Sequence, residues 1–134
     1  AALARKFGIP SRLGYAIVTN HIGVEKLVEY LQREEIVFHG YTELYLDGRW
    51  IKCTPAFDKR ICRITNVAPL DWNGKNDSLF QAFDGGKRFM EYLHFYGEFD
   101  DIPLKLMNQE MKKYYPHLFK GQWLSKAFTF IPGI

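Results

Sequence analysis

The sequence predicts an α+β fold in which an antiparallel sheet packs against helices. Asp47-Gly48 lies between two strand-like runs, and both residue types tolerate the positive φ angles of a two-residue hairpin turn. Apolar residues alternate with others over residues 11–19, as in a strand, and recur at helical spacing over residues 24–35. A chain of 134 residues can bury a core of its own, so we expect residues 1–134 to form a single domain.

The first half of the chain is expected to contain two helices and three strands. Residues 1–7 are rich in helix formers and stop at a Gly-Ile-Pro, so they are typical of the last two turns of a helix. A strand over residues 11–19 follows, and then an amphipathic helix over residues 24–35. The two hairpin strands are residues 36–46 and 49–54.

The second half of the chain is less regular. A short helix is predicted over residues 58–64, and a longer one over residues 104–115, with a proline near each end. Residues 69–86 contain turn dipeptides and are predicted as a loop with a short ordered patch at Leu79-Phe80. Residues 87–99 favour a strand, with a helix as the alternative left open. The inner face of the last helix is expected to carry Leu104, Met107 and Met111.

The hairpin turn determines which residues of the two strands face each other. A two-residue loop pairs Glu43 with Lys52, as a cross-strand ion pair, and Tyr41 with Thr54. His39 then becomes a diagonal neighbour of Thr54, at about 7 to 8 Å between backbones, close enough for direct or water-mediated contact. The face that carries His39 also carries Tyr41, Glu43, Tyr45, Trp50, Lys52 and Thr54, whereas Phe38, Thr42, Leu44, Leu46, Ile51 and Cys53 point the other way.

Two motifs in this region resemble one known family. Residues 39–57 read His-Gly-Tyr-Thr-Glu-Leu-Tyr-Leu-Asp-Gly-Arg-Trp-Ile-Lys-Cys-Thr-Pro-Ala-Phe, which is similar to the histidine motif of the transglutaminase-like superfamily. Upstream, Gly-Ile-Pro-Ser-Arg at residues 8–12 resembles a Gly-Ile-Pro-Ala-Arg segment that leads into a strand in that family. The motifs cover about residues 1–58, and the resemblance implies a papain-like transglutaminase core.

The resemblance also implies thiol acyl transfer on amide bonds, which a Cys–His–Asp triad performs in that family. His39 matches the catalytic histidine. Thr54 stands in place of the aspartate, and its hydroxyl can orient an imidazole although it has no charge to stabilise an imidazolium. Asp58 is a further candidate for that role. The main expected role of Tyr41 and Trp50 is packing. Because they share the face of His39, they could also line a substrate groove.

The resemblance places the nucleophile outside this chain. In the family the cysteine lies near the start of a helix, roughly 14 residues, or about four helical turns, ahead of the position of Gly8. Only seven residues precede Gly8, so we expect a chain truncated in its N-terminal helix. Cys53 and Cys62 are predicted to be structural. The parent protein is then a cysteine protease or protein-glutamine transferase, and the alternative is a catalytically inactive domain that binds a peptide or a protein partner.

Composition restricts the partners further. The net charge is +3 and basic residues are mixed with acidic ones, so the sequence shows no basic patch of the kind that binds nucleic acid. No apolar run approaches the roughly 18 residues of a membrane span. Two separated cysteines do not form a zinc motif. We therefore expect a peptide or protein substrate, no cofactor, no metal, no nucleic acid, no membrane and a cytoplasmic location. His21, His94 and His117 are predicted to have no catalytic role.

Overall fold

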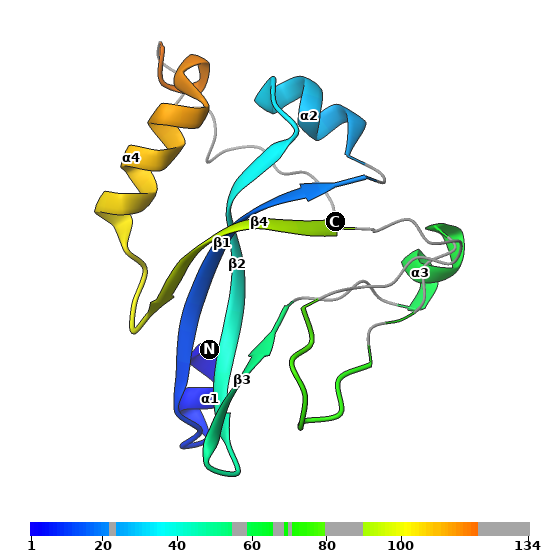
Figure 1. Ribbon diagram of the computed structural model, residues 1–134, viewed down its shortest axis with the longest axis vertical. Coiled ribbons are helices and arrows are strands. Elements are labelled where there is room, and N and C mark those ends of the chain that lie inside the picture. Colours follow the sequence, from blue (N-terminus) through cyan, green and yellow to red (C-terminus); the bar gives the residue numbers. More distant parts are fainter. Residues whose placement is uncertain (22–23, 55–58, 66–68, 70, 80–89, 121–134) are drawn as a thin grey trace.

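The structure is a computed structural model that describes residues 1–21, 24–54, 59–65, 69, 71–79 and 90–120 (Figure 1). Within these residues a curled four-stranded antiparallel sheet is combined with helices, which confirms the predicted mixed class. The strands are β1 (Ser11–Asn20), β2 (Glu35–Leu46), β3 (Arg49–Cys53) and β4 (Met90–Phe99), in the order β3-β2-β1-β4. The helices are α1 (Ala2–Lys6), α2 (Glu25–Leu31), α3 (Lys59–Thr65), α4 (Leu104–Tyr114) and the 3-10 helix η1 (Pro116–Phe119).

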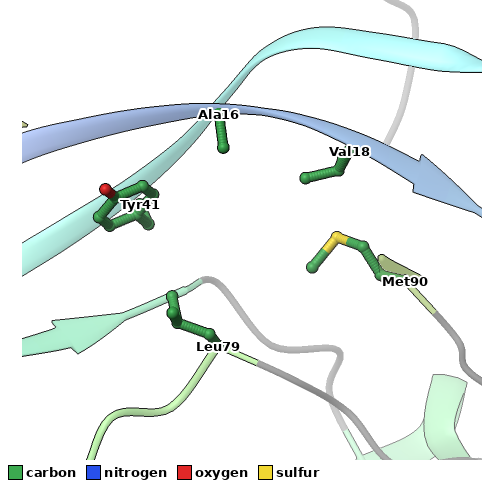
Figure 2. Close-up of a cluster of buried hydrophobic side chains, with 5 residues drawn as sticks. All are labelled: Ala16, Val18, Tyr41, Leu79 and Met90. Carbon is green, nitrogen blue, oxygen red and sulfur yellow. The ribbon is translucent and has the colours of Figure 1, made fainter. Parts of the chain in front are cut away.

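Two clusters of buried side chains lie on opposite faces of the sheet, because alternate residues of β1 point in opposite directions. Ala16 and Val18 belong to one cluster and Ile17 to the other, so we call the two sides the Ala16 face and the Ile17 face. In Figure 2, Leu79 and Met90 point toward the strands on the Ala16 face. The Ile17 face is covered by Leu31 of α2, Val37 of β2 and Tyr115, which follows α4.

The helices α1, α2 and α4 lie at the two ends of the sheet, and α3 lies to one side of it (Figure 1). Figure 1 shows α2 and α4 at one end, and α1 beside the β2–β3 turn at the other. Met111 of α4 packs against the cluster of the Ile17 face, as predicted, whereas Leu104 is 59% exposed. The prediction that Leu104 lies on the inner face of α4 is therefore wrong. No helix in the described part of the chain is long and apolar enough to cross a membrane.

The helix predicted over residues 24–35 is shorter in the structure. The α2 helix ends at Leu31, because Gln32 adopts a left-handed conformation with φ +55°. The chain then enters β2 at Glu35, which was predicted to be helical. A left-handed residue other than glycine or asparagine gives little warning in a sequence, and this explains the error.

The other predicted elements are found where the structure describes them. Residues 90–99 form a strand, so the helical alternative for this segment is excluded, and residues 87–89 lie outside the described part. The short helix predicted over residues 58–64 is α3. In the predicted loop, Ser78 forms a single parallel bridge with Cys53 of β3, and Leu79 is buried. Phe80, the second residue of the predicted patch, is outside the described residues.

Candidate functional site

The β2–β3 hairpin brings His39 and Thr54 together as its turn predicts. Asp47 and Gly48 have φ angles of +50° and +80°, and the register pairs Glu43 with Lys52. Across the two strands, His39 Nε2 lies 3.2 Å from Thr54 Oγ1, which is hydrogen-bond distance. The predicted contact between the histidine and its polar neighbour is therefore confirmed.

The surroundings of this pair favour a neutral imidazole. His39 is half-buried, and burial lowers the pKa of its ring. The ring of Tyr92 on β4 meets the His39 ring edge-on at a centroid distance of 6.0 Å, and the Tyr92 hydroxyl lies 3.5 Å from Thr54 Oγ1. Because Thr54 occupies Nε2, Nδ1 of His39 is the nitrogen left for a proton transfer.

The lowered pKa of His39 predicts a loss of stability in mild acid. The unfolded chain takes up a proton on this residue near pH 6.5, whereas the folded chain does so at a lower pH. Between these two pKa values the unfolded state binds more protons, so the free energy of unfolding decreases as the pH falls. Urea unfolding at pH about 7.5 and about 5.5 should show a smaller decrease for His39→Gln than for the wild type. Equal decreases would assign the effect to other groups.

A charged network lies on the same face, between the histidine and the hairpin turn. Arg12 Nη2 is 2.5 Å from Glu43 Oε2, and Lys52 Nζ is 2.6 Å from Glu98 Oε1. The predicted ion pair between Glu43 and Lys52 is also present, at 3.7 Å. The Tyr41 hydroxyl donates a hydrogen bond of 2.8 Å to Glu98, and burial together with this bond raises the pKa of Tyr41 to about 12. The network therefore joins all four strands beside the candidate site.

The two residues predicted to wall a groove differ in exposure. Tyr41 is only 3% exposed and belongs to the buried cluster of the Ala16 face, so it packs and offers almost no surface to a substrate. Trp50 is 37% exposed. Its ring lies 3.9 Å from the guanidinium carbon of Arg12 and 5.3 Å from the ring of Tyr45. Asp58, the second candidate for orienting His39, lies outside the described residues.

Cys53 does not share the face of His39. It pairs with Thr42 in the hairpin register, and side chains at that position point to the Ile17 face, as predicted. Burial raises the pKa of the Cys53 thiol, and Asp77 raises it further, so the thiolate is disfavoured. Cys62 in α3 is 2% exposed and is therefore not accessible to a substrate.

The start of α1 also lies on the Ile17 face. The amino group of Ala1 is 3.4 Å from Thr42 Oγ1, and Thr42 points away from His39. The Ser11 hydroxyl donates to the carbonyl of Ala1 at 3.1 Å, which fixes this end of the helix against β1. The described part of this helix therefore lies on the opposite side of the sheet from His39.

The other histidines lie apart from this pair. His21 and His94 are exposed, and His117 contacts the carbonyl of Tyr30 through Nε2 at 3.1 Å. Among the described residues, no group of three histidine, cysteine, aspartate or glutamate side chains could hold a metal ion.

Sequence reasoning missed two features of the site. Tyr92 contacts both members of the pair from β4, but no local pattern connects it to a hairpin about 40 residues earlier in the chain. The backbone of Phe38, directly before His39, has φ +60°. The run of three apolar residues that ends at Phe38 breaks the alternation of a regular strand, and this was the available signal.

Comparison with protein-family models, with curated proteins and with solved structures finds no match for this chain.

Proposed function

We propose that this chain is a transglutaminase-like domain with a papain-like core, and that it supplies the histidine of a thiol acyl-transfer site acting on amide bonds. The observation that carries the proposal is the contact of 3.2 Å between His39 Nε2 and Thr54 Oγ1. These residues stand where the sequence resemblance expects the catalytic histidine and the group that orients it. His39 would be the proton acceptor and donor, and Thr54 would hold its ring.

A second contact supports the proposal. Arg12 belongs to the first motif of the resemblance and Glu43 to the second, and their side chains form an ion pair of 2.5 Å. Glu43 is 4% exposed, so this pair is shielded from water on the carboxylate side. The two motifs that carry the resemblance are therefore in contact, which a chance match of two short segments would not require.

The proposed chemistry needs a thiol that these 134 residues do not provide. Such a thiolate would attack the carbonyl carbon of an amide, and the carbon–nitrogen bond would break as a histidine ring nitrogen delivers a proton to the leaving amine. The acyl-thioester would then pass to water or to another amine. In this proposal Nδ1 of His39 carries the proton, because Nε2 is held by Thr54.

The test is amide hydrolysis and amine transfer by the protein as its source produces it. We expect His39→Ala to lower kcat/KM by at least about 100-fold, the usual contribution of a general base and acid. His94→Ala is the matched control, because His94 is an exposed histidine of β4, and it should keep wild-type activity. Incorporation of a fluorescent primary amine into a glutamine-rich protein, and release of ammonia, measure the two reactions.

Two results would contradict this proposal. Activity that survives His39→Ala would remove His39 from the chemistry. Fast alkylation of Cys53 by iodoacetamide, slowed by His39→Ala, would move the nucleophile to Cys53 and overturn the hairpin assignment.

A second candidate function rests on the position of α1. The amino group of Ala1 contacts Thr42 on the Ile17 face, so the described part of this helix lies against the side of the sheet opposite His39. This favours a catalytically inactive domain that binds a peptide or a protein partner on the same scaffold. Absence of both hydrolysis and amine transfer, with retained binding of glutamine-containing peptides, would select this candidate.

A further inference from the structure

The β2 strand contains a bulge immediately before His39. Ala16 of β1 pairs with His39 and Val18 pairs with Ile36, so two residues of β2 lie opposite the single residue between Ala16 and Val18. These two residues are Val37 and Phe38. Phe38 has φ +60°, a conformation that residues with a Cβ atom adopt at an energetic cost and that marks sites held by their surroundings.

The bulge changes which way the following side chains point. In a regular strand, residues two apart share a face, so Val37 and His39 would point to the same side. In the structure Val37 is buried in the cluster of the Ile17 face, and Phe38 packs against the same cluster. His39 points to the other side, toward Thr54. Without the bulge, either Val37 would leave its cluster or His39 would turn away from Thr54.

One side chain from the second half of the chain closes this bulge, in the sense that it bonds to the backbone on both sides of Ile36. The hydroxyl of Tyr115 accepts a hydrogen bond of 2.8 Å from the Val37 N–H and donates one of 2.6 Å to the Glu35 carbonyl. Tyr115 is 1% exposed, so water cannot replace its hydroxyl. The Phe38 ring is held by stacking on Tyr96 at a centroid distance of 4.6 Å. The Val37 N–H, which lies within the bulge, therefore has its hydrogen-bond partner in Tyr115.

We propose that Tyr115 is a positioning residue for His39, which acts by closing the bulge that turns the imidazole toward Thr54. This role would connect the segment after β4, which includes α4 and η1, to the site, although the hydrogen bonds of the Tyr115 hydroxyl go to Val37 and Glu35 and not to His39 or Thr54. This inference rests on the proposed role of His39, but its test reads the state of the imidazole directly and does not need the acyl-transfer reaction.

The experiment compares Tyr115→Phe with Tyr96→Phe by NMR. Each variant removes one hydroxyl that links the α4 region to the sheet, because the Tyr96 hydroxyl donates to Glu110 at 2.9 Å. Only Tyr115→Phe removes the bonds to the bulge. We expect it to accelerate hydrogen exchange of the Val37 amide about tenfold or more, and to move the pKa of His39 up toward its ordinary value as the ring loses its buried position. Tyr96→Phe should leave both quantities at their wild-type values.

Equal changes in the two variants, or no change in either, would overturn the inference.

The wild-type chain offers a second measurement that does not depend on how the variants fold. The Tyr115 hydroxyl proton should exchange slowly and show a nuclear Overhauser effect to the Val37 amide, and its absence would also overturn the inference. A changed His39 pKa in a protein without acyl transfer would contradict only the proposed function. A His39 pKa that does not change in Tyr115→Phe, in a protein that is active, would contradict only the role of Tyr115.

Discussion

Replacing Gly14 by alanine should lower the free energy of unfolding by about 2 to 3 kcal/mol. A Cβ atom at this position would lie 2.0 Å from Cε2 and 2.1 Å from Cζ of the Tyr41 ring, far inside van der Waals contact. The ring has little room to move away, because Tyr41 is 3% exposed and its hydroxyl is held by Glu98. The added methyl group must therefore displace the strand or break the bond to Glu98. Urea unfolding followed by circular dichroism measures the loss.

Gly40→Ala is the matched control, since Gly40 lies one strand away from Gly14 in the same sheet. The nearest atom to a Cβ at Gly40 is Cε1 of Tyr15, at an ordinary contact distance of 3.7 Å. Gly40→Ala should therefore leave the free energy of unfolding nearly unchanged. Alanine fits at this position, and it also lowers the conformational entropy of the unfolded chain, which favours the folded state. Equal losses for the two variants would mean that Tyr41 does not pack across Gly14.

The second large effect is expected for Glu43→Gln, which should lower the free energy of unfolding by about 2 to 4 kcal/mol. Glu43 is 4% exposed and lies between two cations, Arg12 at 2.5 Å and Lys52 at 3.7 Å. Glutamine keeps the shape but removes the charge, so Arg12 loses its nearest carboxylate while it remains two-thirds buried. This loss of unfolding free energy is smaller than the loss expected for a fully buried ion pair, because water still reaches Arg12 and Lys52.

Glu35→Gln provides the control for the removal of a carboxylate from β2. The Glu35 carboxylate lies 3.7 Å from Arg33, and both side chains are substantially exposed. We expect a change within about 0.5 kcal/mol. If Glu43→Gln is equally mild in urea unfolding, then the network joining the four strands adds little to stability.

The hairpin could be predicted closely because its geometry is local. The Asp47-Gly48 turn determines the register, and side-chain alternation from the turn predicts that His39 lies on the same face as Thr54. The face assignment of Cys53 follows from the same argument. These predictions needed no information about distant parts of the chain.

The remaining features depend on contacts between distant segments, and the sequence does not encode these in a readable pattern. Nothing near Glu43 shows that its closest partner is Arg12 of another strand, or that Lys52 is closer to Glu98. The bulge at Phe38 likewise depends on Tyr115, which lies far along the chain. Tertiary contacts of this kind override local preferences, so they appeared only in the structure.

The strand order also has a consequence for how the molecule assembles during synthesis. The strands β1, β2 and β3 follow one another closely along the chain, whereas Asn20 of β1 pairs with Met90 of β4. Closing the longer loop costs more chain entropy, by about 0.6 kcal/mol for each doubling of length. A chain that emerges N-terminus first can therefore pair His39 with Thr54 before β4 exists. Until β4 is synthesised, the cluster of Ala16 and Val18 lacks Met90, so the nascent domain passes through a stage in which part of its future core is incomplete and can be bound by chaperones.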